Sequence, residues 1–238
     1  MSERADAAIL LIGNELLSGR VRDENLQFLA RELWELGMPV RRAWFIRDSV
    51  EEIAIAVGEL ARAHSWLFTT GGIGPTHDDV TVEGVARAFG VALETHPRLE
   101  DLIRLRFGSE TSAPHLRMAL VPRGAVLEGR DDRSWPTIRV ENTLILPGVP
   151  WILQRKFAVI KESFRQSPLH RSSLSLIAGE AELAPILEAA LGNFPDVEIG
   201  SYPAEGHVLV TFEGVDADRV RRACQEVDRA SAAFPRAP

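Results

Sequence analysis

The strongest structural signal in the chain is Thr69-Thr70-Gly71-Gly72-Ile73-Gly74-Pro75-Thr76-His77-Asp78-Asp79-Val80-Thr81. Three glycines in four positions follow a strand-like run, Ser65–Thr70, and precede a helical pattern at Thr81–Phe89. Glycine permits positive φ and lets the backbone approach a ligand closely. A helix N-terminus adds free N–H groups and the positive end of its dipole. This order predicts a βα unit whose turn binds phosphate.

The same stretch supplies side chains for phosphate chemistry. From this turn we expect phosphate to be held by Thr70, Gly71, Gly72, Gly74 and Thr76. Asp78 and Asp79 add two carboxylates suited to Mg²⁺ or another divalent ion that bridges phosphate oxygens. The alternative is an ordinary glycine-rich turn in which aspartate caps the helix. The turn lacks both the Gly-Lys-Ser/Thr ending of a Walker A loop and the dinucleotide-binding Gly-x-Gly-x-x-Gly pattern.

A second loop, Gly13-Asn14-Glu15-Leu16-Leu17-Ser18-Gly19, follows the apolar run Ala7–Ile12. A short continuous apolar run is typical of a strand buried on both faces, and ligands bind at the carboxyl ends of such strands. Gly13 and Asn14 are therefore candidate ligand-binding residues, and Glu15 is a candidate to ligate a metal or position water. Alternatively, Asp23 or Asn25 behind this loop only caps the helix that follows.

A third strand-to-helix turn, Pro147-Gly148-Val149-Pro150, follows the predicted strand Thr143–Leu146. It is either a loop stiffened by proline or a further part of the site, in which case Gly148 contacts the ligand. The residues do not identify a general base, although His77 and Glu15 are candidates. The five tryptophans are interpreted as core or interface residues and not as stacking platforms for bases.

The remaining pattern predicts an α/β protein in two parts. Strand and helix alternate through Val40–Ile46 and Val50–Ala63, the latter with Asp48 and Ser49 as caps, so a mostly parallel sheet with helices on both faces is expected. Further helices are predicted at Pro97–Phe107 and from Pro150 to about Phe164. Between them lies a loop-rich stretch to Arg139, with short strands at 119–122 and 125–128 and a turn at 131–134.

Near Ser167 the pattern changes to a small βαββα set. We predict one α/β domain at 1–168 and a small α+β domain at 169–238.

Composition narrows the classes of partner. The 238 residues carry a formal net charge of −7 and a pI near 5.5, so no broad basic face for nucleic acid is expected. Cys224 is the single cysteine, which excludes a disulfide framework within one chain. The run Ala7–Ile12 is too short to span a membrane, and a cytoplasmic location is expected. Lys156 and Lys161 are the only lysines, which we attribute to genome composition.

With these three loops in place, the chain resembles the CinA-type amino-terminal domain of the molybdopterin-binding (MoaB/Mog, MoCF biosynthesis) fold family. This domain is also found fused to eukaryotic FAD synthases. The motifs that carry the resemblance are Ile12–Gly19, Asp23-x-Asn25, Thr70–Thr76 with Asp78–Thr81, and Leu146–Pro150. They span roughly residues 7 to 165, and the tail at Glu198–Pro203 is similar to the segment that follows this domain in relatives. The resemblance implies a three-layer α/β/α fold.

The resemblance also implies a chemistry. Related proteins bind molybdopterin and help adenylylate it or insert molybdenum, and CinA-like members are associated with metal-dependent hydrolysis of nucleotide pyrophosphates such as ADP-ribose or FAD. By position, the acidic site residues would be Glu15, Asp78 and Asp79, and the phosphate-binding residues Gly71, Gly72, Gly74 and Thr76. We expect a metal-dependent hydrolase, and the alternative is a non-catalytic molybdopterin- or nucleotide-binding protein. The expected cofactor is a divalent ion such as Mg²⁺, with K⁺ as a further candidate, and a homodimer is implied by oligomeric relatives.

Three departures from the family pattern bear on this expectation. Asn14 stands where many members have Asp, which removes one negative charge beside the predicted metal. Val149-Pro150-Trp151 lacks the acidic residue that often follows this turn. His115–Ala119 replaces an Asn-Arg-Lys-Gln-Ala-like run, so only Arg117 and Ala119 match there.

Overall fold

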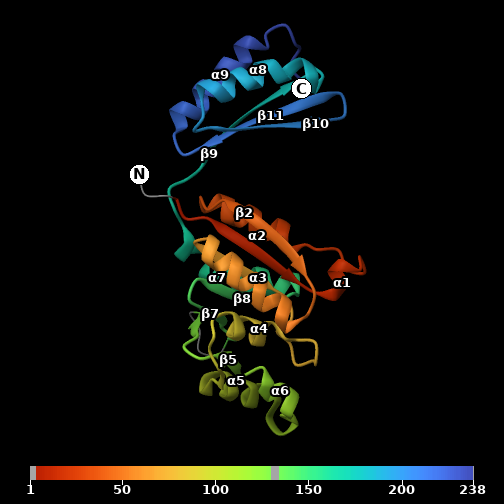
Figure 1. The fold of residues 1–238 in the computed structure, drawn as a ribbon, viewed down its shortest axis with the longest axis vertical. Coiled ribbons are helices and arrows are strands. Elements are labelled where there is room, and N and C mark those ends of the chain that lie inside the picture. The colour runs from red at the N-terminus through yellow and green to blue at the C-terminus, as the bar shows by residue number, and fades with distance from the viewer. Residues whose placement is uncertain (1–3, 130–133, 238) are drawn as a thin grey trace. The chain divides into compact units, whose positions relative to one another are not determined.

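The computed structural model describes residues 4–129 and 134–237. The chain divides into two compact units, one ending at Gln166 and the other starting at Ser167. Figure 1 shows the order of their elements along the chain.

The first unit is built on a six-stranded sheet with the order β2-β1-β3-β8-β7-β6. Its strands are β1 (Ala7–Ile12), β2 (Val40–Ile46), β3 (Trp66–Thr70), β6 (Val126–Glu128), β7 (Thr137–Val140) and β8 (Thr143–Leu146). The four strands from β2 to β8 in this order pair in parallel, and β7 and β6 add an antiparallel edge. The mostly parallel α/β fold predicted from the sequence is confirmed.

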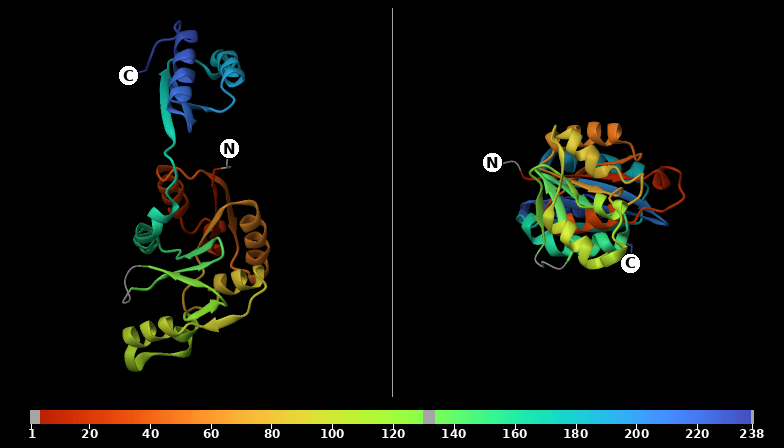
Figure 2. Two further views of the ribbon diagram at one scale, coloured as in Figure 1. Left: turned by 90° about the vertical axis from the view of Figure 1, so that its left-hand side faces the viewer. Right: turned by 90° about the horizontal axis from the view of Figure 1, so that it is seen from below.

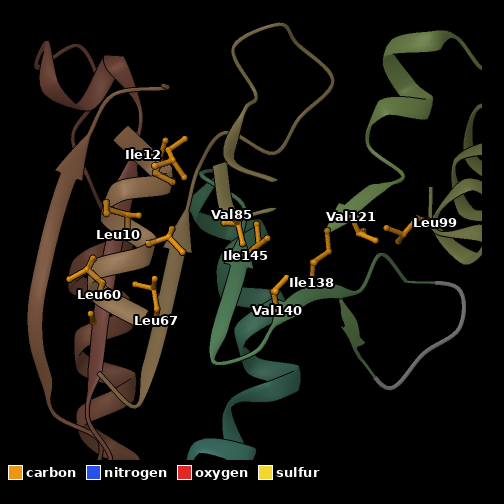
Figure 3. Close-up of a cluster of buried hydrophobic side chains, with 14 of the residues drawn as sticks. Leu10, Ile12, Leu60, Leu67, Val85, Leu99, Val121, Ile138, Val140 and Ile145 are labelled. Atoms are coloured by element: carbon orange, nitrogen blue, oxygen red, sulfur yellow. The ribbon is translucent and has the colours of Figure 1, made fainter. Parts of the chain in front are cut away.

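Every residue of β1 is buried, because helices cover both faces of the sheet. On one face, alternate β1 side chains pack beneath α3 (Val50–Ala63), and the same core extends through α4 (Thr81–Ala88) to α5 (Pro97–Phe107). Figure 3 shows this core, with Leu10, Leu60 and Val85 among its members. On the other face, α2 (Asn25–Glu35) and α7 (Pro150–Ile160) pack on Ala7, Ile9 and Leu11. Figure 2 shows helices on both sides of the sheet, which gives three layers.

Short elements between α4 and β7 account for most differences from the expected pattern. β4 (Leu93–Thr95) pairs with β5 (Leu120–Pro122) in a two-stranded sheet, with a 3-10 turn (Gly108–Glu110) and α6 (Ala113–Arg117) between them. The stretch to Arg139 was expected to be rich in loops, yet Arg139 itself lies in β7. The short strands predicted at 119–122 and 125–128 are present as β5 and β6, whereas β4, the 3-10 turn and α6 were not predicted, because so few residues carry little periodicity. Of the predicted turn at 131–134, only Ser134 lies within the described residues.

The helix starts agree only in part with the predicted caps. Ser49 caps α3 by accepting a hydrogen bond from the Glu52 amide, as predicted. Asp48 instead accepts a hydrogen bond from the backbone N–H of Asn14, at 2.8 Å. The helix predicted from Pro150 to about Phe164 is α-helical only to Ile160. Residues Lys161–Phe164 then form a 3-10 turn.

The second unit has the predicted βαββα order. It consists of β9 (His170–Leu176), α8 (Glu180–Asn193), β10 (Glu198–Ala204), β11 (His207–Gly214) and α9 (Ala217–Ala230). Its three strands form an antiparallel sheet in the order β10-β11-β9. Within the described ranges, no helix of either unit combines the length and apolar character needed to cross a membrane.

Candidate functional site

Three loops meet at the carboxyl ends of the neighbouring strands β1, β3 and β8. Gly71 follows β3 with φ +102°, and a Cβ atom added there would lie 2.1 Å from the carbonyl oxygen of Ile12 at the end of β1. A Cβ added to Gly148, in the loop after β8, would lie 3.2 Å from the Cα of Gly71. Real Cβ atoms are not found as close to backbone as at Gly71, so glycine is required there. A Cβ at Gly148 would require its neighbour to shift by a few tenths of an ångström.

Asn25, at the start of α2, connects these loops from beneath. Its buried side-chain amide donates to the Thr70 hydroxyl at 2.9 Å and to the Gly148 carbonyl at 2.7 Å. Asp23 accepts hydrogen bonds from the first amides of this helix, those of Asn25 and Leu26. Asp23 therefore stabilises the start of α2, which is the capping role given above as the alternative. Asn25 instead holds two ligand-binding candidates, Thr70 and Gly148, in place.

The glycine-rich turn is fixed by contacts at both of its ends. The Thr81 amide donates to Gly72 O at 3.0 Å, and its hydroxyl donates to Gly71 O at 2.8 Å. Thr81 is thus the first residue of α4, whose cap position is Val80, and no aspartate side chain caps this helix. At the other end, Arg117 donates to the carbonyls of Pro75 and Thr76 at 2.7 and 3.1 Å.

The central amides of this turn are available to a ligand. In the described part of the chain, no hydrogen bond uses the backbone N–H of Gly72, Ile73 or Gly74. Gly72 has φ +62°, a backbone conformation that helps successive amides turn toward one point. Such a group of amides binds anions.

These amides line a cavity of about 700 Å³, which we call the first cavity. The sequence-predicted residues that line it are Glu15, Gly71, Gly72, Gly74, Asp79 and Gly148. The structure therefore brings together two of the three predicted carboxylates with residues from all three loops. Its volume lies in the range of sites for small molecules and cofactors, roughly 300–1,000 Å³.

The carboxylates of Glu15 and Asp79 are held differently. Glu15 lies in the short helix α1 (Asn14–Leu17), and a Cβ added to Gly13 would lie 2.4 Å from its carboxylate oxygen. Asp79 accepts hydrogen bonds from the Thr76 amide at 2.8 Å and from the Thr76 hydroxyl. Gly13 therefore leaves room for Glu15, and Thr76 orients Asp79 instead of lining the first cavity.

The other predicted site residues lie outside the first cavity. Thr70 is buried beneath it, and Asn14 is exposed. Thr76 and His77 line a smaller neighbouring pocket of about 150 Å³. Asp78 is exposed, and a hydrogen bond from Thr76 holds the pKa of its carboxyl below the usual value. Within residues 4–129 and 134–237, no three His, Cys, Asp or Glu side chains are grouped closely enough to hold a metal ion.

Residues 8–166 match the protein family described as "Probable molybdopterin binding domain". The chain belongs to this molybdopterin-binding domain family. Residues 168–233, most of the second unit, match a family described as "FAD synthase, middle domain".

Relatives of this molybdopterin-binding domain protein include whole chains and parts of longer ones. A protein of Archaeoglobus fulgidus is 33% identical over 220 residues, which cover 92% of this chain and 95% of that protein. A "Probable FAD synthase" of Caenorhabditis elegans is 30% identical over 232 residues, covering 85% of this chain but 44% of that protein. The crystal structure of "the protein CinA with unknown function" from Thermoplasma acidophilum matches with a TM-score of 0.63 and 28% identity. It covers 68% of this chain and 98% of that one.

The molybdopterin-binding domain of this chain has a cavity wall that the sequence analysis missed. Four residues of this wall are Arg106 from α5, Trp135 before β7, and Ile152 and Lys156 from α7. His115 also lines the cavity and stacks on Phe107, with ring centroids 3.9 Å apart. His115 belongs to the run His115–Ala119, one of the departures from the family pattern.

Lys156 is the most informative of the missed residues. Its Nζ donates to the carbonyls of Trp135 and Pro136, both at 2.7 Å, and burial lowers the pKa of its amine to about 8. Lys161, in contrast, donates to Glu32 at 2.8 Å, and this contact raises the pKa of its amine. The scarcity of lysine was the available sequence signal for this residue.

Proposed function

We propose that the molybdopterin-binding domain hydrolyses the pyrophosphate of a nucleotide such as ADP-ribose or FAD with a divalent metal ion. The observation that carries this proposal is the composition of the first cavity. Unused amides of the glycine-rich turn line the same space as the carboxylates of Glu15 and Asp79. Amides suit phosphate oxygens, and carboxylates suit a hard cation that neutralises them.

The residues present fit a Mg²⁺ ion bound together with the substrate. Mg²⁺ is commonly held by one or two carboxylates plus substrate phosphates, and not by a cage made entirely of protein ligands. Glu15 and Asp79 provide those two carboxylates, and no third acidic side chain accompanies them among the described residues. When bound, the ion would supply Lewis-acid polarisation of the phosphoryl group.

The chain's own residues supply the other parts of the reaction. The amides of Gly72, Ile73 and Gly74 would hold the phosphate oxygens on which charge develops. The general base would take a proton from the attacking water. Of the two candidates for this role, Glu15 lines the first cavity, whereas His77 lines the smaller neighbouring pocket. Glu15 is therefore the base that we propose.

The test is a substrate screen with the full chain. Purified protein is incubated with ADP-ribose, FAD and other nucleotide pyrophosphates under Mg²⁺, Mn²⁺ and Co²⁺, with and without K⁺, and AMP is quantified. Metal-dependent AMP release is expected with at least one substrate. The absence of AMP release from folded protein in every combination would contradict the proposal.

The second candidate function is binding of molybdopterin or a nucleotide without turnover. It is supported by the exposed position of Asp78, which leaves two predicted carboxylates in the first cavity instead of three. Native mass spectrometry of the purified protein separates the two candidates. A retained pterin supports binding, whereas a retained adenine nucleotide that the AMP assay shows to be cleaved supports hydrolysis.

Two further expectations accompany this function. We propose a homodimer, since the family resemblance implies oligomers, and sedimentation equilibrium at several concentrations tests it. A cytoplasmic location is supported by the single cysteine, Cys224, because a reducing compartment suits a chain without disulfides. Fractionation of cells with an antibody against the chain would test the location.

A further inference from the structure

A second cavity, of about 510 Å³, adjoins the first. The two cavities share the wall residues Arg106, Trp135, Ile152 and Lys156. The second cavity extends from this wall between α7 and the segments of β6 and β7, where Glu128 and Thr137 line it. A ligand with two halves therefore has a continuous place to lie across the shared wall.

α7 presents two neighbouring stripes of side chains to these cavities. Trp151, Arg155 and Val159 are spaced four residues apart and line the second cavity, whereas Ile152 and Lys156 line both. Trp151 is 60% exposed and Val159 is 42% exposed. Large apolar side chains grouped in a hollow on the surface mark a site that a partner or ligand covers.

The charges around the shared wall favour an anion. Arg106, Arg155 and Lys156 form no ion pair with any carboxylate among the described residues. The carboxylate on this cavity wall, that of Glu128, is already paired with Arg139 at 2.7 Å. The Lys156 amine is satisfied by two carbonyl groups, which leaves its positive charge without a counter-ion in the described structure.

We propose that the second cavity is a subsite for a planar aromatic ring system of a dinucleotide. In this arrangement the pyrophosphate lies against Lys156 and the glycine-rich turn. Trp151 and Trp135 offer faces on which such a ring stacks, and Arg155 adds a cation that interacts with ring and phosphate alike. The assignment rests on the proposed function for the position of the pyrophosphate, and it names the substrate class as one with a ring system on both sides of the phosphates. Trp151 thereby becomes a stacking residue, whereas Trp135 also packs against the hydrophobic core, as the sequence interpretation expects.

The test compares FAD with its two halves, FMN and AMP, by isothermal titration calorimetry. EDTA is present so that bound FAD is not hydrolysed. The variant is Trp151→Ala, and its matched control is Ile55→Ala, which removes a 70% exposed apolar side chain from α3. A second pair is Lys156→Met with Lys161→Met as its control. Circular dichroism checks that each variant is folded, and Arg155→Ala serves if Trp151→Ala does not fold.

Trp151→Ala is expected to weaken FAD binding by about tenfold, the size of one lost stacking contact. It should weaken one of the two halves similarly and leave the other half unchanged. Lys156→Met should weaken FAD and both halves, because all three carry phosphate. Unchanged FAD affinity in Trp151→Ala, or an equal loss for FMN and AMP, would overturn the subsite.

This outcome separates from failure of the proposed function. If the wild-type protein releases AMP from FAD while Trp151→Ala binds FAD normally, the proposed hydrolase activity is supported and the proposed subsite is contradicted. If the wild-type protein neither binds nor cleaves FAD, the subsite is contradicted, and the other substrates of the screen decide whether the hydrolase is contradicted as well.

Discussion

The glycine turns that form the floor of the first cavity are held by backbone, whereas its wall is made by side chains. The floor consists of Gly71, Gly72, Gly74 and Gly148, and a Cβ atom added to Gly71 would overlap the Ile12 carbonyl. The wall consists of Arg106, Trp135, Ile152 and Lys156, which come from separate elements. The contrast suggests that the floor sets the kind of group bound, phosphate, and that the wall selects the rest of the ligand.

The largest expected effect is on the floor. Gly71→Ala would place a Cβ atom against the Ile12 carbonyl, at a φ of +102° that side chains rarely adopt. We expect the free energy of unfolding, measured by urea denaturation, to fall by roughly 3 kcal/mol or more. The control is Gly90→Ala, at φ +67° with no atom within 4 Å of the new Cβ, which should cost about 1 kcal/mol. Equal losses in the two variants would show that the loop contact is not tight.

The next effect separates the two neighbouring aspartates. Asp79 lines the first cavity and Asp78 is exposed outside it. Asp79→Asn should therefore lower kcat for AMP release by about a hundredfold or more, with the fold intact by circular dichroism. Asp78→Asn should have a much smaller effect. A larger loss in Asp78→Asn than in Asp79→Asn would mean that the loop rearranges when substrate binds.

The wall can be examined through Lys156. Because the chain has only two lysines, acetylation by acetic anhydride followed by peptide mass spectrometry reports on each amine separately. The amine reacts only when deprotonated, so Lys156, with a pKa of about 8, should be half-reactive near pH 8, whereas Lys161 becomes reactive only at higher pH. Parallel pH profiles for the two lysines would contradict the burial of Lys156.

Other charged groups facing Lys156 affect how this profile responds to ligand. The two cavities are also lined by the cations Arg106 and Arg155 and by the carboxylates of Glu15, Asp79 and Glu128, whereas the lowered pKa of Lys156 comes from burial. A bound pyrophosphate adds negative charge, so FAD should move the profile of Lys156 to higher pH and leave Lys161 unchanged.

The smallest effect is expected at Asn14, the departure that seemed most harmful from sequence. Its side chain is exposed, and it is the backbone N–H of Asn14 that bonds to Asp48. Restoring the family residue with Asn14→Asp should change kcat/KM for AMP release by about fivefold or less, since an exposed charge contributes about 1 kcal/mol or less. A larger gain would place this side chain among the metal ligands.

The same contrast explains how much the sequence could predict. The floor was predictable because glycines, buried strands and helix starts are local signals, and Gly71, Gly72, Gly74 and Gly148 do line the first cavity. The wall was not predictable, because Arg106 and Lys156 lie 50 residues apart in the chain and meet only through tertiary packing.

The difference between Asp78 and Asp79 was also beyond the sequence. Asp79 faces the first cavity because the turn at 76–79 closes through hydrogen bonds from Thr76 to its carboxylate. From sequence spacing alone, either of two neighbouring aspartates could line the cavity. Likewise, the short strand β4 forms by pairing with β5, from which α5 and α6 separate it in the chain, and no local pattern records this pairing.

The most direct test of the central claim is Mn²⁺ binding followed by electron paramagnetic resonance. The measurement is made with and without an α,β-methylene analogue of ADP-ribose, whose P–C–P bridge is not hydrolysed. If Glu15 and Asp79 hold the ion together with the ligand's phosphates, Mn²⁺ should bind weakly alone and at one ion per chain with the analogue. In Asp79→Asn, the analogue should no longer produce binding of one Mn²⁺ ion per chain. Mn²⁺ binding that the analogue does not strengthen, or that Asp79→Asn retains in full, would contradict the account.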